Sequence, residues 1–264
     1  HLAVASMGLS FASARLIMAL YFFYSLSLSN WMIRIPDVQH RLGLEPAALS
    51  ICLLGVPIGL VCSMAFSGIV VDRMGPRNAI RYGIFFLMIP LLLPGFAWSP
   101  TVLFVALVLV GLGMGPLEVA LNVTADRIGT AIGRTVMSRC HGFWSLGLMA
   151  GGATGTFAAT IGLDPGPHLA IALVAIIILA ELLAARLPRL DPAPADPDAP
   201  KAPIFVLPPK SIVALCLFAF GMLLVEGAIT DWSAIYLRDV FGAVPPVTGF
   251  AFTGMIYFVV CFAM

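Results

Sequence analysis

The chain has 264 residues, of which 61% are hydrophobic and only 10% are charged. Soluble globular domains carry about 25% charged residues, so this composition predicts a membrane protein instead of a soluble domain. The formal net charge is +1. Because the arginines stand at the borders of apolar stretches and form no basic stripe, we exclude nucleic acid as a partner.

The chain contains a series of long apolar stretches. A helix rises about 1.5 Å per residue, so about 20 apolar residues cross a hydrocarbon core of about 30 Å. The first stretch is longer than a signal peptide and no small-residue cleavage site follows it, so we interpret it as a retained helix. The sequence therefore predicts an all-α, polytopic membrane helix bundle with spans at 16–33, 47–71, 79–97, 101–124, 142–163, 169–185, 211–230 and from 247 onward.

A proline-rich segment divides these spans. Residues 187–209 contain eight prolines, which exclude a helix and predict an extended linker. We expect three parts: 1–186 as an N-terminal six-helix bundle, 187–209 as a cytoplasmic linker and 210–264 as the start of a C-terminal bundle. Asn30-Trp31 recurs as Asp231-Trp232 after about 200 residues, which is a faint parallel repeat of the kind found in secondary transporters.

The distribution of Lys and Arg predicts the orientation in the membrane. Cytoplasmic borders carry an excess of these residues. One set of borders holds only Arg34, Arg41 and Arg238. The N-terminus and the turn at Asp72 are therefore predicted to be cytoplasmic, because the opposite borders hold Arg15, Arg73, Arg77, Arg81, Arg127, Arg134, Arg139, Arg186, Arg189, Lys201 and Lys210.

The turn between the second and third spans carries the most specific motif, Gly68-x-x-x-Asp72-Arg73-x-Gly75-x-Arg77. It resembles the signature loop of the major facilitator superfamily. The resemblance implies the major facilitator fold of twelve helices in two six-helix bundles, functional as a monomer. The chain opens at His1 and reaches Met264 within an apolar run, so we expect the six-helix half, helix seven and part of helix eight, a truncated form of that fold.

Further segments resemble narrower groups of that superfamily. Residues 113–122, with Glu118 and Asn122, are similar to helix four of the fucose:proton symporter group. The segments 31–37, 141–147 and 226–232 resemble uncharacterised bacterial inner-membrane members near that group. These resemblances imply location in the bacterial inner membrane and a small-molecule substrate.

The loop motif has two interpretations. Asp72, Arg73 and Arg77 stand at the membrane border, where a carboxylate can accept hydrogen bonds from helix amides or from arginines across the bundle. Gly68 and Gly75 are expected to allow close backbone approach and a sharp turn. The motif is then a conformational latch between the halves. The alternative is an ordinary positive-inside turn that anchors the helices.

Glu118 is the leading candidate for proton coupling. A charge in the centre of a bilayer costs several kcal/mol and usually faces a water-filled cavity. Asn122 lies one turn after Glu118, and Gly111 and Gly115 share the same helix face. A carboxylate in that setting is expected to bind and release a proton. The alternative is a structural carboxylate hydrogen-bonded to a neighbouring helix.

Other polar residues are weaker candidates for the substrate path. Glu226 and Asp231 lie in the seventh span, where Asp231 could instead be solvated or cap the outer loop. Asn30 is a candidate hydrogen-bond partner for a polar substrate. His141 could relay protons or cap its helix, and Trp144 could stack on a sugar ring or anchor the interface. The five cysteines and the four histidines lack metal-site spacing, so we expect no metal and no cofactor.

These features predict a secondary active transporter of a small polar solute, and not an enzyme. Proton-coupled uptake of a sugar-like solute by alternating access is the leading hypothesis, driven by an ion gradient because no nucleotide-binding motif is present. Two alternatives stay open. One is an efflux antiporter of amphipathic compounds, and the other is a transporter-like membrane sensor that moves nothing.

Overall fold

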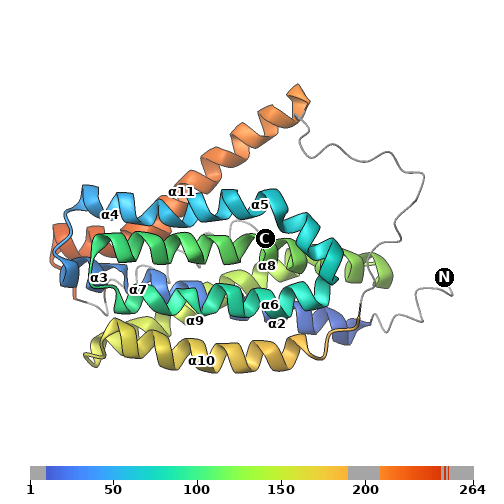
Figure 1. Ribbon diagram of the computed structural model, residues 1–264, viewed down its shortest axis with the longest axis horizontal. Coiled ribbons are helices and arrows are strands. Elements are labelled where there is room, and N and C mark those ends of the chain that lie inside the picture. Colours follow the sequence, from blue (N-terminus) through green and yellow to red (C-terminus); the bar gives the residue numbers. More distant parts are fainter. Residues whose placement is uncertain (1–9, 190–208, 245–246, 248, 250–264) are drawn as a thin grey trace.

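The computed structural model describes residues 10–189, 209–244, 247 and 249. Within this part all regular elements are helical, and most of the long helices run side by side along one axis (Figure 1). The elements are α2 (Phe11–Met32), α3 (Ile35–Leu42), α4 (Pro46–Leu53), α5 (Gly55–Met74), α6 (Pro76–Met88), η1 (Pro90–Leu92), α7 (Leu93–Phe96), α8 (Pro100–Ile132), α9 (Met137–Thr160), α10 (Pro165–Ala184) and α11 (Lys210–Phe241).

The helical bundle predicted from the sequence is confirmed. Five helical segments of the described part are long and apolar enough to cross a membrane: Phe11–Leu42, Pro46–Met74, Pro76–Phe96, Pro100–Ile132 and Pro165–Ala184. The fifth predicted span, 142–163, overlaps α9, which ends at Thr160 and is not among these five. Its five glycines and its threonines lower its apolarity although it is 24 residues long. The linker at 190–208 and nearly all of the expected eighth helix lie outside the described residues.

Several helices extend beyond the apolar stretch that predicted them. The span expected at 101–124 is part of α8, which has 33 residues and continues to Ile132. The apolar stretch marks only the part of the helix that lies in the lipid. The helix itself continues until a residue that favours a left-handed backbone conformation. That residue is Gly133, with φ 66°. At its other end, the Ser99 hydroxyl caps α8 by accepting from the Val102 amide at 3.2 Å.

Close contact between α5 and α8 fixes the centre of the bundle. Gly59 of α5 and Gly111 of α8 face each other so closely that a Cβ on either would overlap a backbone carbonyl of the partner helix. One turn further on, a Cβ at Gly115 would overlap Ser63. The small-residue ladder predicted on α5, Gly55, Gly59, Ser63 and Ser67, is buried and packs on α8.

A second close contact joins α2 to α9. A Cβ at Gly147 would overlap Ser25 and the carbonyl of Phe22, and a Cβ at Gly155 would overlap Ile33. The Ser29 hydroxyl also donates to the carbonyl of Leu148 at 2.6 Å. Because α2 further packs on α8 and α10, the two tight pairs join into one bundle around α2 and α8.

We predict that Gly59→Ala destabilises the protein by about 1–3 kcal/mol, because its new methyl group would overlap the carbonyl of Val108 and separate α5 from α8. Thermal unfolding in detergent micelles measures the effect. Gly68→Ala is the matched control on the same helix, since a Cβ there meets nothing within 4 Å. Equal unfolding temperatures for the two variants would contradict this account of the contact.

Candidate functional site

Glu118 and Asn122 lie one turn apart in the middle of α8. Both side chains are half-buried. The Glu118 carboxylate makes no hydrogen bond or ion pair that the described residues provide, and its oxygens are not among the fully buried polar atoms. Asn122 accepts a short hydrogen bond at Oδ1 from the hydroxyl of Tyr21 in α2. An accessible carboxylate therefore lies beside an amide whose oxygen is already engaged.

Aromatic side chains of α2 connect this pair to α9. The ring of Tyr21 meets His141 edge to face with centroids 6.0 Å apart, and Tyr24 meets Trp144 edge to face at 4.8 Å. Both tyrosines interact electrostatically with Glu118. We name Tyr21, Tyr24, Glu118, Asn122, His141 and Trp144 the α2–α8–α9 cluster. The fold thus brings together four residues that were singled out in two separate segments of the sequence, 113–122 and 141–147.

The two tyrosines were missed by the sequence analysis. Both tyrosine side chains are buried. The Tyr24 hydroxyl is fully buried and has no hydrogen-bond partner in the described part of the chain. Buried tyrosine hydroxyls usually find a partner. Two tyrosines three residues apart in α2 were the available signal, because that spacing places both hydroxyl groups on one helix face.

The Tyr21 hydrogen bond gives the cluster a defined chemistry. With its oxygen occupied, Asn122 presents its Nδ2 group as a donor, and no described residue accepts from it. Glu118, one turn earlier, presents an acceptor when ionised and also a donor when protonated. A hydroxyl group of a small solute needs one hydrogen-bond donor and one acceptor. The Asn122 Nδ2 group next to the Glu118 carboxyl group can supply both.

A crevice of about 330 Å³ opens beside this cluster, at the end of the bundle where α8 ends and α9 begins. Asp126, Thr130 and Arg134 line it, together with Met137. The sulfur of Met137 lies 3.7 Å from the Tyr21 hydroxyl, so the crevice wall touches the Tyr21–Asn122 pair. We call this end of the bundle the Asp72 end, and the end that holds α3 the Arg34 end.

Asn30 lies away from the cluster although it is on the same helix. It is nine residues from Tyr21, which places it on the opposite side of α2. It is 1% exposed, donates to the carbonyl of Leu26 at 2.8 Å and accepts from Thr154 at 3.1 Å. Its hydrogen bonds therefore belong to the contact between α2 and α9.

Of the two candidate acids in the second part of the chain, only Asp231 has a described side chain, and it makes no contact with the cluster that the described residues show. Asp231 is partly exposed on α11, next to Trp232, which packs against the core. The side chain of Glu226 lies outside the described residues. No group of three His, Cys, Asp or Glu residues within the described ranges could hold a metal ion.

The loop motif forms the predicted sharp turn, with Gly75 at φ 74° between α5 and α6. Asp72 and Arg73 are exposed, and Arg77 donates to the carbonyl of Ala185 at the end of α10. The close approach predicted at Gly68 is not found in the described structure, because a Cβ there would meet open space. These contacts anchor the turn within the first half, and the latch stays a prediction.

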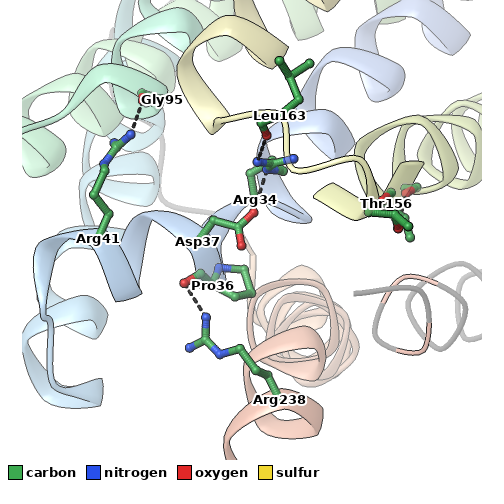
Figure 2. Close-up of polar contacts among 10 residues, drawn as sticks. Arg34, Pro36, Asp37, Arg41, Gly95, Thr156, Leu163 and Arg238 are labelled. Carbon is green, nitrogen blue, oxygen red and sulfur yellow. Dashed lines mark hydrogen bonds and ion pairs between the residues drawn. The ribbon is translucent and has the colours of Figure 1, made fainter. Parts of the chain in front are cut away.

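Charged residues also gather at the Arg34 end, where the sequence analysis named no site. Arg34 is 2% exposed, pairs through Nε with Asp37 at 2.7 Å and donates to the carbonyl of Leu163 at 2.5 Å (Figure 2). Arg41 donates to the carbonyls of Gly95 and Ala97 at 2.8 and 3.1 Å. Both arginines therefore bind α3 to neighbouring segments of the first half.

We predict a coupling free energy of about 1 kcal/mol between Tyr21 and Asn122 in a double-mutant cycle with Tyr21→Phe and Asn122→Leu. Unfolding by sodium dodecyl sulfate in mixed micelles measures it. Tyr82→Phe is the matched control, since Tyr82 is 54% exposed on α6 and should show no coupling to Asn122. Additive effects of the two cluster substitutions would mean that the hydrogen bond contributes nothing.

Comparison with known proteins identifies the family. The family model of the Major Facilitator Superfamily matches residues 17–264. The chain is 30% identical over 232 residues to an uncharacterized MFS-type transporter of Yersinia pestis, covering 88% of this chain and 59% of the relative. It is 29% identical over 215 residues to an uncharacterized transporter of Sinorhizobium fredii, covering 81% and 56%. The chain spans a little over half the length of these relatives. The helical bundle, the Gly75 turn and the family match together place this chain in the Major Facilitator Superfamily.

Proposed function

We propose that this protein is a secondary active transporter that moves a small polar solute across the membrane by alternating access, and not an enzyme. The observation that carries the proposal is Glu118, an acid with no hydrogen bond or ion pair to the described residues, in the middle of a membrane-length helix. A structural carboxylate in a membrane needs a partner, whereas a coupling carboxylate must stay available to a proton.

Proton coupling follows from the surroundings of Glu118. The aromatic side chains of Tyr21 and Tyr24 lie near it, and no described residue forms a salt bridge with it. A carboxylate inside a membrane that has no salt-bridge partner stays available to a proton. Binding of a solute hydroxyl would then alter the balance between the two forms, which couples solute binding to proton binding.

The substrate class follows from the donor and acceptor of the α2–α8–α9 cluster. Asn122 offers Nδ2–H and Glu118 offers its carboxyl group, which together fit a hydroxyl group. Trp144 offers an aromatic surface against which a sugar ring can pack. These features favour a sugar-like solute, in agreement with the resemblance of residues 113–122 to the fucose:proton symporter group.

We further propose a bacterial inner-membrane location with the Asp72 end in the cytoplasm. The charges of Arg73, Arg77 and Arg81 lie at that end, and positively charged residues are retained on the cytoplasmic side. The crevice of about 330 Å³ then opens inward. Residues 187–209 would be the cytoplasmic linker between two six-helix halves, and one copy would suffice for transport.

The function is tested by uptake into proteoliposomes of the full-length protein. We predict that an imposed inward proton gradient drives uptake of at least one solute from a panel of sugars and other polar compounds, and that Glu118→Gln abolishes gradient-driven uptake. The substitution keeps the hydrogen-bonding shape of the side chain and removes its titration.

Glu45→Gln is the matched control, because Glu45 is an exposed acid before α4 and caps no helix through its side chain. It should transport like the natural protein. If both variants lost uptake, the loss in Glu118→Gln would not be specific to that position and would contradict its role in coupling. If the folded natural protein showed no gradient-dependent flux of any solute, the symporter would be refuted. Outward movement of amphipathic compounds would instead establish the efflux antiporter.

The orientation is tested by cysteine labelling in a cysteine-free background. Asn78 and Glu45 are exposed at opposite ends of the bundle. A membrane-impermeant maleimide applied to spheroplasts should label Glu45→Cys at once and Asn78→Cys only after permeabilisation. The reverse pattern would place the Asp72 end outside the cell.

A further inference from the structure

Arg238 of α11 reaches across to α3, although about 200 residues separate the two in the chain. Its guanidinium donates from Nη1 to the carbonyl of Pro36 (Figure 2). It also donates from Nη2 to Oε1 of Gln39 at 2.9 Å. Its Nε pairs with Asp239, its neighbour on the same helix, at 2.8 Å. All three guanidinium nitrogens of Arg238 therefore have a partner, and two of these partners belong to the first half of the protein.

The α3 segment is a fixed platform for these contacts. The ion pair of Arg34 with Asp37 and its hydrogen bond to Leu163 hold the start of α3, and Arg41 holds its end. All of these partners belong to the first half. Arg238 therefore binds a segment that moves with the first half, while Arg238 itself belongs to α11.

The helices around this contact fit closely. Ala234 of α11 packs in one cluster with Ile33 and Leu148 of the first half. The space that remains beside Arg238 measures about 40 Å³ and is walled by small side chains such as Thr156, Ala159 and Ala243. At the Arg34 end, α11 therefore packs on the first half with little open space between them.

We propose that Arg238 is a clasp between α11 and α3 that holds the Arg34 end closed and must release before that end can open. Both hydrogen-bond acceptors on α3 are neutral, and Asp37 of α3 attracts Arg238 without forming a salt bridge with it, so release breaks no salt bridge between the described residues of α3 and α11. Asp239 stays bound to the guanidinium on its own helix, so the charge keeps a partner after release. These two features allow a contact that is specific and can also be broken repeatedly.

The test is the distance between two spin labels in the full-length protein, measured by double electron–electron resonance in nanodiscs. The labels replace His40 and Val240, which are exposed on α3 and α11 beside the clasp, in a cysteine-free background. We expect Arg238→Gln to raise the population of the longer distance about tenfold, the change expected when hydrogen bonds from a charged donor are lost.

Arg41→Gln is the matched control. It removes the same charge and two carbonyl contacts at the same end, but both contacts lie within the first half. It should leave the distance distribution as in the natural protein. Gln39→Met removes one acceptor without removing a charge and should give a smaller shift in the same direction, which keeps the test valid if Arg238→Gln folds poorly.

Folded Arg238→Gln and Gln39→Met variants with unchanged distances would refute the clasp, and so would an equal shift in Arg41→Gln. The measurement needs no substrate. Its outcome is therefore independent of whether Glu118 couples transport to protons.

Discussion

Contact between helices through glycine is the constraint on which the rest of this structure depends. In lipid there is little hydrophobic drive for helices to associate, so they associate through close van der Waals packing at small residues. Gly59 meets Gly111 between α5 and α8, and Gly147 and Gly151 meet α2. Any side chain at these points would push backbones apart. The positions of all other side chains in the bundle follow from these two tight pairs.

The α2–α8–α9 cluster is a direct result of this packing. Because α9 lies so close to α2, the rings of His141 and Trp144 reach Tyr21 and Tyr24. The same arrangement brings the Tyr21 hydroxyl to Asn122 and leaves Glu118 without a partner among the described residues. One turn of α8 therefore combines an amide whose oxygen is engaged with an acid that has no hydrogen-bond partner among the described residues. Such a combination costs stability in a membrane. The proton coupling that we propose for Glu118 gives a reason for this cost.

The two ends of the bundle differ in how their charges are used. At the Asp72 end, Arg81 pairs with Glu181 at 3.0 Å and Arg77 caps the end of α10, both within the first half, beside an open crevice. At the Arg34 end, buried Arg34 and exposed Arg41 secure α3, and Arg238 extends the network to α11. Arginine suits these positions because its rigid fork can bind several carbonyls at once.

The sequence by itself determined the class of the protein. Apolar length and small residues identify spans and packing faces, so the helical bundle, the Gly75 turn and the ladder on α5 are confirmed. Helix periodicity also placed Glu118 and Asn122 on one face. Helix periodicity could not identify the partners of Glu118 and Asn122, because it gives the direction in which a side chain points and not the residue of the neighbouring helix that lies there.

Only the tertiary structure decided which faces meet. The sequence singled out Asn30 as a candidate hydrogen-bond partner for a polar substrate, yet in the fold it lies opposite Tyr21 and accepts a hydrogen bond from Thr154 of α9. Gly68 shares a helix with Gly59, yet it faces open space in the described structure. Arg238 counts in the sequence as one border charge, whereas in the fold it binds Pro36 and Gln39. These contacts join residues from about 100 to 200 positions apart, and no local pattern encodes such pairings.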